Sequence, residues 1–86
     1  MEAQTMMVNV RLSADMANIL GKPRLTVPLE QDATVADLIT ILREQHPALQ
    51  QNLNHVVPII SGHHASPTQQ LSAGQEVALL RPIAGG

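Results

Sequence analysis

The spacing of apolar residues changes along this chain, and that change constrains the fold more than any other feature. Val8, Val10 and Leu12 alternate with polar residues, which is the period of a strand with one buried face. Residues 25–29 repeat this period. Over residues 34–45 the apolar residues instead fall at i, i+3, i+4 and i+7, the spacing of a helix with one apolar stripe. The pattern predicts strands that pack on a single main helix.

Local sequence signals mark where two predicted helices begin and end. Thr34 precedes the main apolar stripe, and Asp37 lies three residues after Thr34. This spacing is similar to a capping box. Pro47 ends this helix because proline cannot continue the hydrogen-bond pattern. A shorter helix is predicted between Ser13, as its N-cap, and Gly21, which supplies a left-handed stop.

Two later segments, residues 56–61 and 75–80, are predicted strands that are apolar on both faces. One helix covers only one face of a small mixed sheet. Alternation directs Val77 toward the helix, so Ala78 and Leu80 face away from it. An uncovered apolar patch of this kind usually marks a protein partner, and the alternatives are loops that cover it or self-association of the domain.

Composition narrows the function classes. The 86-residue chain has no Cys, Phe, Tyr or Trp, so its core is aliphatic and it has no disulfide, thiolate metal site or thiol nucleophile. A net charge of −2 supplies no basic surface for nucleic acid. No segment approaches the ~20 apolar residues of a membrane span, and the first residues do not resemble a signal peptide. We therefore expect one cytoplasmic domain.

Other chemistry-bearing residues form no site in the sequence. His63 and His64 are adjacent, so on an extended segment they point to opposite sides. With His46 and His55 they lack the cysteine or nearby carboxylate that completes a zinc site. The serines have no nucleophile-elbow context, and the internal glycines do not form a phosphate-binding loop. We expect no metal site and no catalytic activity from the chain alone.

The last residues are the most informative for function. We predict a domain over residues 1–80 and a flexible tail over residues 81–86 that ends in Gly85 and Gly86. Because glycine has no Cβ, such an end can pass through a channel too narrow for side chains. An ionised carboxylate is a poor electrophile and becomes reactive only after activation, for instance as an acyl-adenylate. The alternative is a frayed, glycine-rich terminus.

Residues 71–86, which read LSAGQEVALLRPIAGG, resemble the C-terminus of the MoaD/ThiS family of ubiquitin-like sulfur carriers. The small subunit of molybdopterin synthase, one type in this family, commonly has a Gly-Asp-Glu-Val turn, an apolar strand, Pro-Pro-Val and a Gly-Gly end. Residues 33–38 similarly resemble the start of the family's helix. The resemblance implies an α+β fold, the ubiquitin-like β-grasp. It has a mixed sheet of four to five strands packed on one main helix, with the first and last strands parallel at its centre.

The resemblance also implies a mechanism. An E1-like adenylating enzyme uses ATP to activate the terminal glycine, here Gly86, and a sulfur donor enzyme converts it to a thiocarboxylate. The tail then enters the active site of the large subunit of molybdopterin synthase, where sulfur converts precursor Z to molybdopterin. The chain is thus expected to be a non-catalytic, sulfur-donating subunit with no permanently bound cofactor.

The family's remaining site residues carry over by position. The resemblance places Leu80 where the family presents an apolar residue to its partner, and alternation adds Ala78 to the same predicted partner interface. The resemblance assigns the arm inserted into the partner to the following residues: Arg81, Pro82, Ile83, Ala84 and Gly85.

Departures from the family pattern leave the partner open. Arg81 stands where the molybdopterin-synthase type usually has the first of two prolines, and it either meets an acidic group on the partner or is a solvated charge. The aromatic partner-contact residues are missing throughout. The alternatives are a carrier for another pathway, of the thiamin type, and a protein modifier whose Gly86 joins a lysine of another protein. A third alternative is a passive interaction module.

Overall fold

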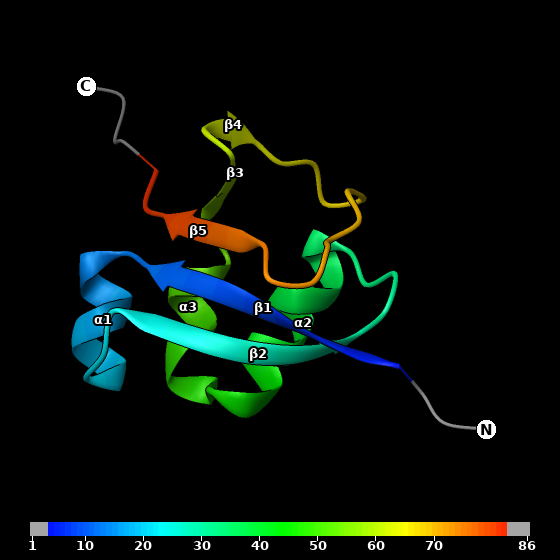
Figure 1. The fold of residues 1–86 in the computed structure, drawn as a ribbon. Helices are drawn as coiled ribbons and strands as arrows, with labels where there is room; N and C mark the ends of the chain where they lie inside the picture. Colours follow the sequence, from blue (N-terminus) through cyan, green and yellow to red (C-terminus); the bar gives the residue numbers. More distant parts are fainter. Residues whose placement is uncertain (1–3, 83–86) are drawn as a thin grey trace.

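The computed structural model describes residues 4–82, which form a single layer of strands with helices on one side of it (Figure 1). The elements in chain order are β1 (Thr5–Leu12), α1 (Ala14–Leu20), β2 (Arg24–Glu30), α2 (Val35–Gln45), the 3₁₀ helix η1 (Pro47–Leu49), α3 (Gln50–Leu53), β3 (Val57–Ile60), β4 (His63–His64) and β5 (Glu76–Leu80).

The five strands of this part of the chain lie in the order β2-β1-β5-β3-β4. β1 and β5 are parallel neighbours although they come from opposite ends of the chain, and the other pairs are antiparallel. This is the mixed β-grasp sheet that the sequence predicted, with the first and last strands side by side, and the prediction is confirmed.

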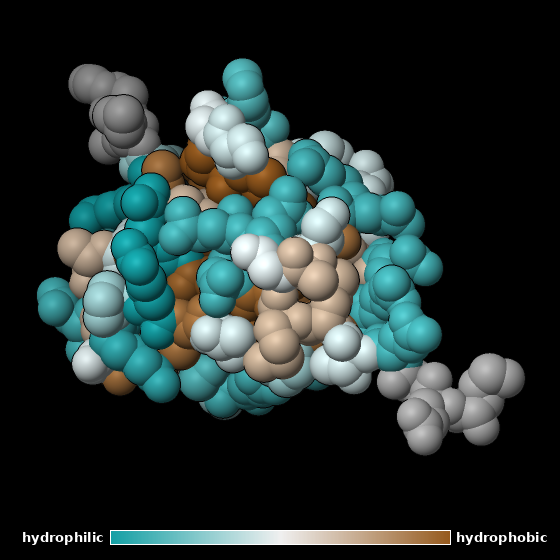
Figure 2. Space-filling view, viewed as in Figure 1, coloured by the Kyte–Doolittle hydropathy of each residue, from teal (hydrophilic) through white to brown (hydrophobic). Residues whose placement is uncertain are grey.

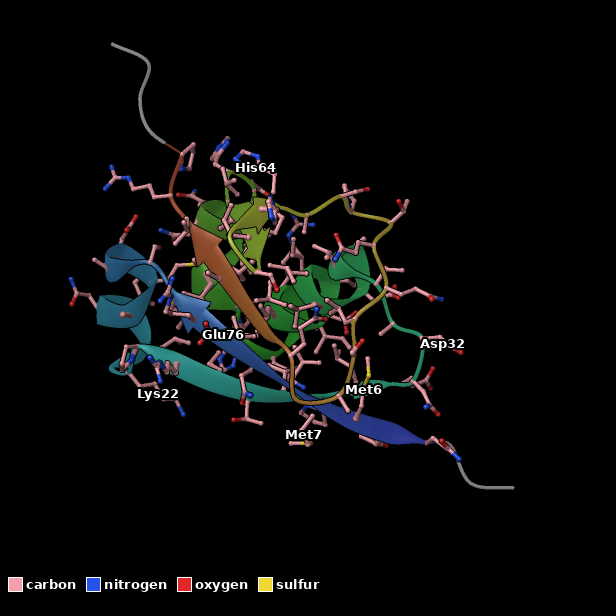
Figure 3. The ribbon with its side chains drawn as sticks, turned by 45° about the horizontal axis from the view of Figure 1, so that its top comes forward. Met6, Met7, Lys22, Asp32, His64 and Glu76 are labelled. Carbon is pink, nitrogen blue, oxygen red and sulfur yellow. The ribbon has the colours of Figure 1, made fainter. Side chains whose placement is uncertain are left out.

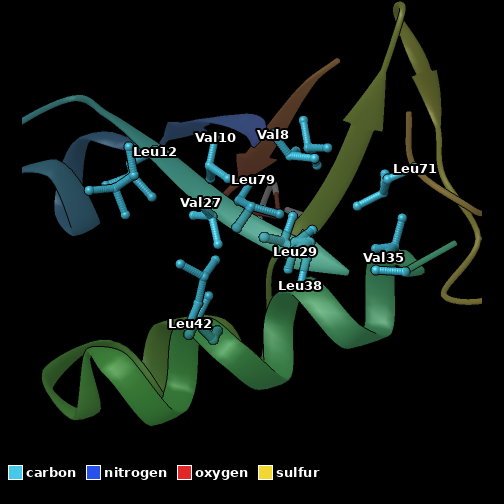
Figure 4. Packing of buried hydrophobic residues seen from close by; sticks show 14 of the residues in the cluster. Val8, Val10, Leu12, Val27, Leu29, Val35, Leu38, Leu42, Leu71 and Leu79 are labelled. Atoms are coloured by element: carbon cyan, nitrogen blue, oxygen red, sulfur yellow. The ribbon is translucent and has the colours of Figure 1, made fainter. Parts of the chain in front are cut away.

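One face of the sheet packs against α2 to form the core (Figure 4). Buried and exposed residues alternate along β1 and β2, as predicted for strands with one buried face. The fully buried side chains include Val8, Val35, Leu38, Leu42 and Leu79. Since no aromatic ring contributes, the packing depends on aliphatic side chains that contact one another across the sheet–helix interface.

The predicted start of α2 is confirmed in detail. The Asp37 backbone N–H donates to Thr34 Oγ1 at 3.3 Å, and the Thr34 N–H donates to Asp37 Oδ2 at 2.9 Å. These reciprocal bonds form a capping box, which satisfies N–H groups at the first turn of the helix. Ser13 occupies the N-cap of α1 but makes no side-chain capping bond, whereas Gly21 ends that helix at φ 78°, as predicted.

The segment between β4 and β5 is pinned to the start of α2. The Leu71 N–H donates to the Ala33 carbonyl at 2.8 Å, and the Val35 N–H donates to the Gln69 carbonyl at 3.0 Å. Leu71 is also buried in the core. The connection is therefore held in place despite its lack of regular structure, and it brings the chain back to the central position of β5.

Candidate functional site

The face of the sheet away from α2 carries a small apolar surface on β3 and β5. The register places Leu80 opposite Val57 and Ala78 opposite Ile59. We call these four residues the apolar patch. Figure 2 shows apolar side chains reaching the surface over β3 and beside the end of β5. Leu80 is 36% exposed, so the domain leaves a large aliphatic side chain in contact with solvent at this position.

The members of the apolar patch differ in what they present to solvent. Val57 and Ile59 are partly exposed, but Ala78 is only 4% exposed although it is outside the core cluster. Its register neighbours are Ile59 on one side and Arg11 on the other, and both have longer side chains. Ala78 therefore forms the floor of the patch, while Leu80 is its most accessible member. The assignment of both residues to a partner interface stays a prediction.

The tail leaves the domain directly after Leu80, and a polar contact lies at this exit. Arg81 Nη1 is 3.9 Å from Asp15 Oδ2, and Asn52 Nδ2 donates to the same carboxylate oxygen at 3.4 Å. The Arg81 side chain is 74% exposed, so solvent screens this ion pair and its contribution is about 1 kcal/mol or less. Arg81 is thus mostly in solvent and pairs weakly with Asp15 of α1, and its contact with an acidic group of a partner stays a prediction.

A shallow hollow of about 250 Å³ adjoins this contact. It is lined by Ser13, Asp15, Gln51, Asn52, His55, Val56, Arg81 and Pro82. Ligand sites for small molecules usually measure about 300–1,000 Å³ and are more enclosed, so the hollow marks the junction of α1, α3 and the tail exit rather than a substrate pocket.

Sequence reasoning missed Asp15 and Asn52 as neighbours of the tail. Asp15 comes from α1 and Asn52 from α3, and neither residue has a motif that links it to Arg81. Only the parallel pairing of β1 with β5 brings the start of α1 beside the end of β5. A local pattern carries no signal for such a contact.

The remaining predicted site residues, Ile83, Ala84, Gly85 and Gly86, lie outside the described residues, so their roles stay predictions. Within residues 4–82, no three His, Cys, Asp or Glu side chains gather as a metal site would require. In the same range no helix has the length and apolar character needed to cross a membrane.

Comparison with known proteins gives a consistent result. A sequence model of the ThiS family matches residues 10–86. Small archaeal modifier protein 1 of Haloferax volcanii is 32% identical in an alignment 84 positions long, which covers 88% of this chain and 97% of that protein. Its crystal structure superposes with a TM-score of 0.81 at 29% identity, covering 91% of this chain and 99% of the other.

Two further solved structures have the same fold. A putative molybdopterin converting factor, subunit 1, from Pyrococcus furiosus has a TM-score of 0.81 at 21% identity, covering 91% of this chain and 99% of its own. A complex of subunits 1 and 2 of the molybdopterin-converting factor from Helicobacter pylori contains a chain with a TM-score of 0.67 at 23% identity, covering 94% and 100%. At these identities the likeness establishes the β-grasp architecture alone.

Proposed function

This chain belongs to the ThiS family of ubiquitin-like carriers and modifiers, and we propose that it carries sulfur as a thiocarboxylate on Gly86. The observation that carries the proposal is the family match, which extends to residue 86 and so includes the Gly-Gly sequence. The chain has no cysteine, so it has no thiol on which to carry sulfur. The Gly86 carboxylate, once activated, can take up sulfur instead.

The chemistry balances in two steps. The Gly86 carboxylate attacks the α-phosphate of ATP, which forms an acyl-adenylate and releases pyrophosphate. Hydrosulfide delivered by a sulfur donor enzyme then attacks the acyl carbon, and AMP leaves with one of the two carboxylate oxygens, so that one oxygen is replaced by sulfur without an oxidant or a reductant. An E1-like adenylating enzyme supplies the catalytic groups for the first step and a sulfur donor enzyme supplies the sulfur. The chain itself contributes the Gly86 carboxyl group and the surface that its partners bind. The use of ATP in the adenylation step is consistent with a cytoplasmic reaction.

We further propose that the acceptor complex is molybdopterin synthase, with this chain as its small subunit and precursor Z as the sulfur acceptor. The apolar patch, with Leu80 at its most exposed point, would contact the large subunit while residues 81–86 enter its active site. The support is the fold shared with a chain of the Helicobacter pylori complex of subunits 1 and 2, together with the patch itself. A thiamin-type pathway is the alternative acceptor.

A second function, protein modification, is favoured by the 32% identity to Small archaeal modifier protein 1. The same adenylate would then be attacked by a lysine amine of another protein, AMP would leave, and an isopeptide bond would join that lysine to Gly86. The two functions share the activation step and differ only in the nucleophile that follows.

Intact-mass measurement separates these functions. The protein is incubated with ATP, a sulfur source and the E1-like enzyme encoded in the same genome. Replacement of one oxygen by sulfur supports the carrier, whereas conjugates of higher mass on a gel support the modifier. If neither product forms, both functions are contradicted.

Deletion of Gly86 gives the matching variant test. We expect it to abolish either product while the melting temperature stays unchanged, since terminal residues contribute little to stability. Gln50→Ala serves as the control because it changes an exposed residue of α3 and leaves residues 81–86 intact. A Gly86 deletion that retains full product formation would refute the proposed reacting group.

A further inference from the structure

The cationic side chains gather at one end of the sheet. The chain has five Lys and Arg residues, and four of them, Arg11, Lys22, Arg24 and Arg81, belong to this end. Arg11 and Arg24 are register partners on β1 and β2, Lys22 precedes β2, and Arg81 follows β5. Since β1 and β5 are parallel, with Leu12 opposite Leu79, the ends of both strands coincide here. We call these four residues the basic rim.

The negative charges are distributed differently. Glu30, Asp32 and Asp37 line a hollow at the opposite end of the sheet. Figure 3 shows Lys22 and Asp32 at opposite ends of the domain, with Glu76 between them. Within residues 4–82 the single ion pair is that of Arg81 with Asp15, so Arg11 and Arg24 have no carboxylate partner in this part of the chain. The separation is incomplete, because Asp15 lies beside Arg81 and Glu76 lines a hollow with Arg24.

The basic rim is continuous with the apolar patch. Arg24 pairs with Arg11, Arg11 with Ala78, and Ala78 with Ile59. One row of the outer face therefore runs across four strands, from two cations to two apolar residues. Arg11 and Arg24 are both exposed. Like charges directly opposite each other on neighbouring strands are destabilising, so the stability of the isolated domain does not account for the pair.

We propose that this row is a docking surface for a partner protein that places carboxylates opposite Arg11 and Arg24 and apolar side chains opposite the apolar patch. This inference rests on the proposed function, and it specifies the chemistry of the partner's face. An apolar centre with a charged rim is the usual composition of a protein interface. Rim charges of this kind accelerate association more than they slow dissociation.

A nucleic acid is a less suitable occupant. A protein that neutralises about 6–10 phosphates needs more cations than this rim supplies. The chain also has no aromatic side chain on which bases could stack. Carboxylates on a protein fit both the small number of cations and the apolar residues that share the row.

Association kinetics test the proposal, with the E1-like adenylating enzyme encoded in the same genome as the probe. The double variant Arg11→Gln/Arg24→Gln is compared with Gln45→Glu/Gln50→Glu, which makes the same change in net charge. Gln45 and Gln50 are exposed residues of α2 and α3, in the helical layer. Rates are measured at about 0.1 M and 1 M salt, where the Debye length falls from about 10 Å to 3 Å.

We expect the arginine variant to associate about tenfold more slowly than the wild type at low salt, with dissociation changed less than twofold. At high salt the difference in association rate should disappear. The association rate of Gln45→Glu/Gln50→Glu should stay within twofold of the wild type at both salt concentrations. The melting temperature of the arginine variant should be unchanged or higher, because the opposed like charges are gone.

Several results would overturn the docking surface. These are equal slowing in both double variants, no slowing in the arginine variant, no association of the wild type, or tight salt-dependent binding of the wild type to duplex DNA. Intact-mass measurement on the same samples tests the proposed function separately. If Gly86 acquires sulfur but the arginine variant associates normally, only the docking surface fails. If charge-dependent association occurs without sulfur loading, only the carrier function fails.

Discussion

Leu79 and Leu80 are neighbours in β5 that face opposite sides of the sheet, so truncating each to alanine separates folding from partner binding. Leu79 is fully buried in the core (Figure 4). Leu→Ala at such a position costs about 2.7–5 kcal/mol because a cavity remains. A domain of this size has a total stability of only about 4–13 kcal/mol. At about 4–8 °C per kcal/mol, Leu79→Ala should lower the melting temperature by more than about 10 °C.

Leu80→Ala should have the opposite profile. The side chain is already partly in water, so its loss should cost the free energy of unfolding about 1 kcal/mol or less. If Leu80 is the accessible member of the partner interface, the same change should weaken binding about tenfold, which corresponds to about 1.4 kcal/mol.

The assay must suit a chain without aromatic residues. Intrinsic fluorescence is not usable because Phe, Tyr and Trp are absent, so unfolding is followed by far-ultraviolet circular dichroism. Binding to the adenylating enzyme is measured by calorimetry at a temperature where both variants are folded. Equal loss of stability in the two variants would refute the assignment of opposite faces. Unchanged affinity of Leu80→Ala would refute the contribution of Leu80 to the interface.

Three further predictions concern local structure and are checked by thermal unfolding. Thr34→Ala removes the capping bond to Asp37 and should lower stability by about 1 kcal/mol, whereas Thr34→Ser should retain it. Gly21→Ala should cost about 1–2 kcal/mol because φ is 78° although the space is open, and Gly21→Asn should cost less. Asp15→Asn should cost at most about 1 kcal/mol, and 1 M salt should remove the difference, since it removes the charge that pairs with Arg81 and keeps an amide oxygen that can accept from Asn52. Unchanged stability of Thr34→Ala or Gly21→Ala, or a loss in Asp15→Asn that 1 M salt does not remove, would contradict the assigned contact.

The sequence predicted the longer elements closely. The predicted helix over residues 34–45 corresponds to Val35–Gln45, and the predicted strand over residues 75–80 corresponds to Glu76–Leu80. The short elements were harder. Local patterns do not locate the His63–His64 strand or α3, because two to four residues are too few to display a period.

For the candidate site, the sequence identified the outward direction of Leu80 and the tail that follows it. It did not reveal that Ala78 is almost covered, that Arg81 meets Asp15, or that Arg11 lies opposite Arg24. Each of these facts depends on which strands are neighbours and in which register they pair.

The sequence by itself determined where strands and the main helix form, which side of each is apolar, and which family the chain resembles. These properties depend on side-chain spacing and capping within a few residues of one another. Local patterns did not decide that β1 and β5 lie side by side, which only the family resemblance implied. The tertiary structure alone decided that this pairing joins the basic rim to the apolar patch at the exit of the tail. The physical reason is that backbone hydrogen bonds between strands are the same for any sequence, so the pairing of distant segments is selected by the packing of the whole core.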